Sequence, residues 1–112
     1  MRLNKRQIEQ KAAYGGASGC RVDLLKTEAI ANEVADRLWQ NLRESNKTLE
    51  RRFVNVLPSM EYPGTWLVRY RRIRMPSGAA GARETNARRG EAMKRAVMAS
   101  YSSSDLVDSW TS

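Results

Sequence analysis

The chain is predicted to fold as a single α+β domain, and three features of the sequence support this prediction. Apolar residues in the stretch 23–44 recur every three or four positions, which is typical of an amphipathic helix. Two stretches, 51–57 and 65–73, alternate between apolar and polar residues on either side of a Pro-Gly pair, which is typical of a β-hairpin. Helical periodicity returns between residues 83 and 101. The predicted fold is a long helix and a C-terminal helix packed on a small antiparallel sheet.

The length and net charge of the chain limit the kinds of partner that it can bind. The 112 residues suffice for one domain with a modest core. The net charge is +8 and arginine carries most of it, which favours polyanions or acidic protein surfaces, since guanidinium binds phosphate and carboxylate bidentately. No apolar run approaches the roughly 20 residues of a membrane span, and the basic N-terminus lacks the apolar segment of a signal peptide. We therefore expect no membrane partner.

The N-terminal segment 1–19 is predicted to be a helical arm with a glycine joint. Asn4 and Gln7 have the spacing of a capping box, and Leu3 and Ile8 have the spacing of a hydrophobic staple, so a helix is expected over residues 3–14. The glycine-rich stretch 15–19 should end this helix and act as a flexible joint. Such an arm either packs on a neighbouring subunit or folds back on its own core.

The main domain is assigned to residues 20–101. Asp23 is the expected N-cap of the long helix, whose buried stripe is built around Ile30, Val34, Leu38 and Leu42. In the second strand of the hairpin, Trp66, Val68 and Tyr70 should face this helix. The opposite face should carry Leu67, Arg69, Arg71 and Ile73.

A basic surface follows the hairpin. The stretch 76–82 is predicted to be a loop, mobile together with its flanks over residues 74–89. The closing helix over residues 83–101 should bury Ala92, Met93, Ala96 and Val97. The arginines that we expect to face a partner or DNA are Arg69, Arg71, Arg72, Arg74, Arg83, Arg88 and Arg89.

The segment 102–112 is predicted to be a flexible tail with an apolar anchor. Leu106, Val107 and Trp110 would share one side of a helical turn that Ser104 caps. Such a turn can dock into a groove on a neighbouring subunit. The alternative is that the tail folds back over its own hairpin.

Catalytic and cofactor-binding patterns are missing from the sequence. There is no histidine, which is the commonest general base and metal ligand, and the single cysteine, Cys20, cannot build a thiolate zinc site. Gly78 and Gly81 do not form a phosphate-binding loop motif. We expect neither an enzyme nor a bound cofactor or metal. The signatures of the common sequence-specific nucleic-acid-binding modules are missing as well.

The layout from Arg21 to Tyr101 resembles the small neck proteins of tailed bacteriophages, which are the head-to-tail connector and tail-completion subunits. The resemblance lies in the order of elements: a short lead at residues 2–4, the long helix 23–44, a twisted hairpin, a glycine-rich basic loop and the closing helix 91–97. It implies a virion protein that forms a homo-oligomeric ring around the DNA channel and contacts other neck and tail proteins. The alternative is a small basic nucleic-acid-binding protein of host or phage.

Overall fold

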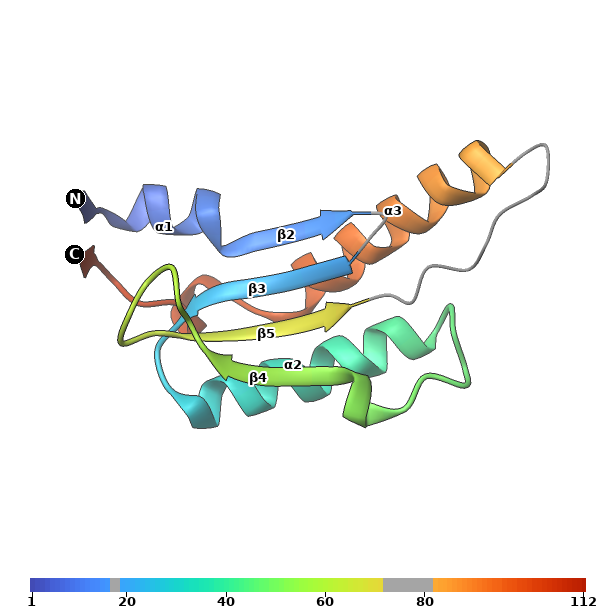
Figure 1. The fold of residues 1–112 in the computed structure, drawn as a ribbon, viewed down its shortest axis with the longest axis horizontal. Coiled ribbons are helices and arrows are strands. Elements are labelled where there is room, and N and C mark those ends of the chain that lie inside the picture. Colours follow the sequence, from blue (N-terminus) through green and yellow to red (C-terminus); the bar gives the residue numbers. More distant parts are fainter. Residues whose placement is uncertain (17–18, 72–81) are drawn as a thin grey trace.

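The computed structural model describes the backbone of residues 1–16, 19–71 and 82–112. It confirms the predicted α+β class. The order of the main elements is α1, β2, β3, α2, β4, β5 and α3 (Figure 1). Two short strands, β1 and β6, lie at the chain ends, and two 3-10 turns precede β4 and β6.

The main sheet has four antiparallel strands rather than only the predicted hairpin. Its order is β2 (Ala13–Gly16), β3 (Gly19–Leu25), β5 (Trp66–Arg71) and β4 (Val54–Pro58). Because β5 pairs antiparallel with both β3 and β4, those two strands run parallel on either side of it. The unit β3-α2-β4 is therefore a split β-α-β motif.

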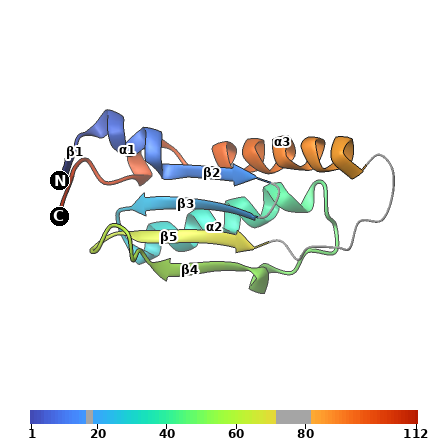
Figure 2. The same cartoon turned by 45° about the horizontal axis from the view of Figure 1, so that its top comes forward.

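Both long helices cover the same face of this sheet. In Figures 1 and 2, α2 (Glu28–Arg43) lies behind β4 and β5, and α3 (Ala82–Ser100) lies along β2 and β3. The first turns of α3 extend past the ends of the strands. Neither of these two described helices covers the other face of the sheet, and we call it the open face.

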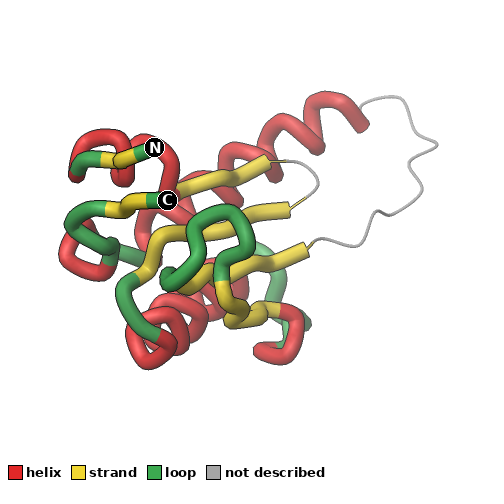
Figure 3. The backbone as a smooth tube through the Cα atoms, turned by 60° about the vertical axis from the view of Figure 1, so that its left-hand side comes forward, coloured by secondary structure: helices red, strands yellow, loops and turns green. Residues whose placement is uncertain are grey.

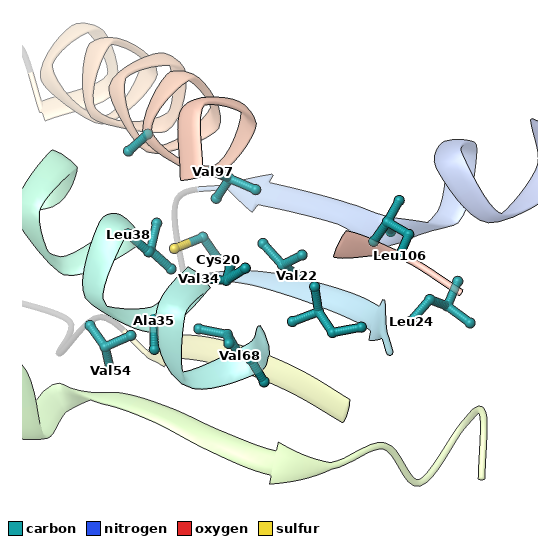
Figure 4. Packing of buried hydrophobic residues seen from close by; sticks show 14 of the residues in the cluster. Cys20, Val22, Leu24, Val34, Ala35, Leu38, Val54, Val68, Val97 and Leu106 are labelled. Atoms are coloured by element: carbon teal, nitrogen blue, oxygen red, sulfur yellow. The ribbon is translucent and has the colours of Figure 1, made fainter. Parts of the chain in front are cut away.

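The core fills the space between the sheet and the two helices. Figure 4 shows Val34, Ala35 and Leu38 of α2 beside Cys20, Val22 and Val68 of the strands, with Val97 of α3 close by. Each of these side chains is buried. Trp66 and Tyr70 pack against this cluster and are partly buried, as their predicted orientation toward the helices requires.

The predicted start of α1 (Lys5–Ala12) is confirmed. The Asn4 side chain accepts a hydrogen bond from the Gln7 backbone N–H at 3.0 Å, and the Gln7 side chain accepts one from the Asn4 N–H at 2.9 Å. Leu3 and Ile8 are buried, as a hydrophobic staple requires.

The glycine joint at residues 15–19 is a wrong prediction in its described part. Gly15 and Gly16 belong to β2, and Gly19 begins β3, so the two strands form a hairpin. Segment 1–16 is therefore part of the single domain and not a separate arm. Gly15 has a packing role, because an added Cβ would lie 2.8 Å from the Cα atom of Lys94 on α3. Helix and strand can approach this closely only where the strand carries no side chain.

The N-cap assigned to Asp23 is also wrong. Thr27 caps α2, and its side-chain oxygen accepts a hydrogen bond from the Ile30 N–H at 3.1 Å. Asp23 lies in β3, where the register with β5 shifts between Val22 and Leu25. Leu24 has a φ of 62°, which is rare for a residue with a side chain.

The β4-β5 hairpin and the end of α3 follow the predicted pattern, except that the start of the predicted strand 51–57 is wrong, because Arg51–Phe53 form a 3-10 turn before β4. The Thr65 N–H donates to the Tyr62 carbonyl at 3.1 Å, and Gly64 has a φ of 89°, so residues 62–65 form a type II turn. Helix α3 begins at Ala82 and buries Met93, Ala96 and Val97. The predicted loop 76–82 lies outside the described residues except for Ala82, and the described residues 82–89 of the predicted mobile segment are helical.

The C-terminal segment is part of the folded domain. After the turn η2 (Ser103–Asp105), Leu106 pairs with Leu25, and the Val107 N–H donates to the Leu24 carbonyl at 2.9 Å. Strand β6 (Trp110–Thr111) then pairs with β1 (Arg2–Leu3), which brings the two chain ends side by side (Figure 3). The prediction of a free flexible tail over residues 102–112 is therefore wrong for this chain.

Candidate functional site: a basic row on the open face

A row of polar side chains crosses all four strands on the open face. The register places Tyr14 of β2 opposite Arg21 of β3, Arg21 opposite Arg69 of β5, and Arg69 opposite Asn55 of β4. All four residues are exposed, while their neighbours Cys20, Val22, Val54 and Val68 face the helices and are buried. We call Tyr14, Arg21, Arg69 and Asn55 the cross-strand row.

Arg71 extends this basic surface toward the end of β5. It is exposed and lies on the same face as Arg69, two residues further along the strand. Its cross-strand partner on β3 is Gly19, which has no side chain to cover it. The open face therefore holds three arginines on two adjacent central strands.

The charges of this row are only partly balanced. Arg21 lies 3.4 Å from a carboxylate oxygen of Glu61, a contact between two half-exposed side chains. Among the described residues, no acidic side chain forms an ion pair with Arg69 or Arg71. Like charges directly opposite each other in a sheet are destabilising. The pairing of Arg21 with Arg69 thus costs folding stability and does not contribute to it.

The loop 59–65 covers the other end of the open face. It brings Glu61 to Arg21, and beneath it Asp23 is buried. One carboxylate oxygen of Asp23 accepts a hydrogen bond from the Leu24 N–H at 2.7 Å, and the other is buried without a partner among the described residues. Burial raises the pKa of Asp23 above its usual value, although the hydrogen bond from Leu24 opposes this effect.

The structure brings together only some of the arginines that the sequence singled out. Arg69 and Arg71 lie on the open face as predicted, and Arg88 is exposed on α3. Arg72 and Arg74 lie outside the described residues. Arg83 and Arg89 are described only by their backbone positions on α3.

The three residues of the predicted tail anchor contact their own domain. Leu106 is 1% exposed and belongs to the core, and Val107 packs against it. The Trp110 ring meets the ring of Tyr62 edge-on with 5.2 Å between centroids, and its indole N–H donates to the Pro63 carbonyl at 3.3 Å. The alternative, in which the tail folds back over its own hairpin, is the arrangement observed.

Tyr14, Arg21 and Asn55 were missed as candidates. A signal for Arg21 existed, because Cys20, Val22 and Leu24 alternate with polar residues as in a strand. Leu24 also fits the apolar stripe of the following helix, and the helical interpretation was preferred. Tyr14 joins the row only through the β2-β3 pairing, which no local pattern indicates.

Cys20 is buried, and the described acidic side chains do not gather into a metal-binding cluster. The Cys20 thiol is buried in the core, and burial raises its pKa to about 12, so the nucleophilic thiolate is scarce at neutral pH. Within the described ranges, no three potential metal ligands lie together. The helices of the described part also lack the length and apolar character needed to cross a bilayer.

Comparison of the chain with protein-family models, curated proteins and solved structures found no match.

Proposed function

We propose that this chain is a structural, non-enzymatic virion subunit of a tailed-phage neck. In this proposal, identical copies form a ring at the head-tail junction around the DNA channel and contact other neck and tail proteins. The proposal starts from the resemblance in the order of elements. The observation that supports it in the structure is a sheet whose two edge strands, on opposite sides, pair with no other described strand along their outer edges.

The two free edges allow head-to-tail contacts between copies. Strands β2 and β4 end the sheet on opposite sides, and no other described strand pairs with their outer edges. A free strand edge presents backbone N–H and C=O groups that can pair with a strand of another chain. Because the two edges belong to different strands, a contact between them is heterologous, and such contacts close into rings when the rotation permits.

The test is the assembly state of the purified protein. Native mass spectrometry and electron microscopy should show closed rings of one copy number. A chain that stays monomeric at about 100 μM, with and without duplex DNA, would contradict the proposal.

A matched pair of variants tests whether the outer edge of β4 takes part in ring formation. Leu57 of the edge strand β4 and Leu67 of the central strand β5 are cross-strand partners, and both are half-buried. A lysine on an edge strand opposes pairing with another chain. Leu57→Lys should therefore reduce ring formation, while Leu67→Lys should retain it at a comparable melting temperature.

A small basic nucleic-acid-binding protein remains the second candidate. The observation that favours it is the pair Arg69 and Arg71, which lack an ion-pair partner in the described part of the chain. A protein of this class does not need to form a closed ring in order to bind DNA. The mass of the DNA complex therefore separates the two candidates, because the proposed subunit should bind as a ring.

A further inference from the structure

We propose that the cross-strand row, together with Arg71, binds the sugar-phosphate backbone of duplex DNA without reading its sequence. This inference deepens the proposed function and rests on it, since a neck ring encloses double-stranded DNA. It assigns the contact to the open face of the main sheet.

The dimensions of the row suit a duplex. Four adjacent strands are separated by three spacings of about 4.8 Å, so the row from Tyr14 to Asn55 extends over roughly 14 Å. The grooves of B-DNA are about 6 Å and about 12 Å wide. The side chains of one row can therefore reach phosphates on both sides of a groove.

The charges of the row indicate an anionic ligand. Arg21 and Arg69 are directly opposite each other, and Arg71 adds a third positive charge on the same face. The repulsion is relieved when an anion lies over all three groups. Duplex DNA carries one negative charge per roughly 1.7 Å of its axis, and binding releases the counterions condensed on it.

The residue types in the row fit phosphate contacts better than base contacts. Arginine, asparagine and tyrosine side chains all donate hydrogen bonds to phosphate oxygens. Both long helices lie on the opposite face of the sheet, so neither can enter the major groove from this surface. The surface should therefore bind DNA of any sequence with similar affinity.

A second copy of the chain is a poor match for this face. Five of the twelve acidic side chains are engaged in ion pairs within each copy. Ion pairs join Glu33 and Asp105 to Arg37, Asp36 to Arg51, Glu50 to Arg52 and Glu61 to Arg21. Duplex DNA supplies a dense run of negative charge to a chain whose net charge is +8.

The experiment measures fluorescence anisotropy of a labelled 30-base-pair duplex over a range of salt concentrations. The test variant is Arg69→Gln/Arg71→Gln. The matched control is Arg43→Gln/Arg95→Gln, which removes the same charge from exposed positions on the helical layer. Each lost phosphate contact lowers the slope of log K against log salt by about 0.9. The test variant should bind about tenfold or more weakly, and its slope should fall by about 2.

Four outcomes would overturn the inference. These are no binding by the wild type, an equal loss in both variants, a strong dependence on the duplex sequence, and preference for a single strand of the same length over the duplex. If the wild type forms rings but does not bind duplex DNA, only this inference fails. If it binds DNA through Arg69 and Arg71 as a monomer, the proposed ring fails instead.

Discussion

Val68 and Arg69 are neighbours on β5, yet they lie on opposite faces of the main sheet. Val68 is 0% exposed and lies under the helices, whereas Arg69 is exposed and faces Arg21 across the strands. The covered face gathers apolar side chains at close packing, and each of them contributes to stability. The cross-strand row places like charges opposite each other, which opposes folding. The contrast indicates that the covered face holds the fold together and that the open face is available for a partner.

The largest loss of folding stability is expected in the C-terminal segment, where Leu106 adds to the core beneath the covered face. Leu106→Ala should lower the free energy of unfolding by about 2–5 kcal/mol, because it removes a fully buried side chain. Urea denaturation measures the loss. Met98→Ala is the control, because this side chain is 57% exposed on α3. Equal and small losses in both variants would show that the segment is not part of the core.

A smaller loss is expected where α3 approaches β2 most closely. Gly15→Ala should destabilise the fold by about 1–3 kcal/mol, because the new Cβ would meet the backbone of Lys94. Gly90→Ala should have the opposite effect, because nothing lies within 4 Å of its added Cβ. Alanine favours the helix over glycine, so this variant should stabilise α3 by up to about 1 kcal/mol. Thermal unfolding of both variants checks the pair. A neutral Gly15→Ala variant would mean that helix and strand are not in close contact.

Asp23 is an exception on the open face, because the loop 59–65 buries it. Its pKa is raised in the folded state, so between its ordinary pKa and the raised value the folded protein holds a proton that the unfolded chain has lost. Stability should therefore be higher at low pH and fall as pH rises from the ordinary pKa through the raised pKa.

Denaturation across pH 3 to 8 tests this dependence. Asp23→Asn should remove this part of the profile, and the exposed Asp108→Asn serves as the control. A profile that is the same in the wild type and in Asp23→Asn would contradict the assigned burial of the carboxylate.

The smallest effect on stability is expected on the cross-strand row. Arg69→Gln should change the free energy of unfolding by no more than about 0.5 kcal/mol, and the direction should be stabilising because a like-charge pair is removed. Differential scanning calorimetry at low salt provides the measurement. A loss above about 1 kcal/mol would show that Arg69 contributes to the fold, and the contrast between the two faces would then fail.

Local signals made part of this fold predictable. The capping box at Asn4 and Gln7 and the Pro63-Gly64 turn depend on residues within four positions of each other, and both form as predicted. Strand β3 was missed because Leu24 fits a helical stripe as well as a strand, and the irregular register at Asp23 interrupts the alternation. The position of the C-terminal segment depends on pairing with Leu24 and Leu25, about 80 residues earlier in the chain, and no local pattern specifies it.

The candidate site was also predictable only in part, namely where it depends on a single strand. Alternation along β5 correctly placed Arg69 and Arg71 opposite the helix-facing residues. Tyr14, Arg21 and Asn55 come from three other strands, and only the cross-strand register brings them into one row. A surface built across strands that are distant in the sequence requires the sheet order, which periodicity alone does not supply.

The most direct test of the functional contrast between the two faces is an NMR titration of the 15N-labelled protein with a short DNA duplex. The amide and arginine side-chain signals of Tyr14, Arg21, Arg69 and Arg71 should shift together with added DNA, and those of α2 should stay in place. Shifts centred on α2, or no shift at the open face under low-salt conditions, would contradict the account.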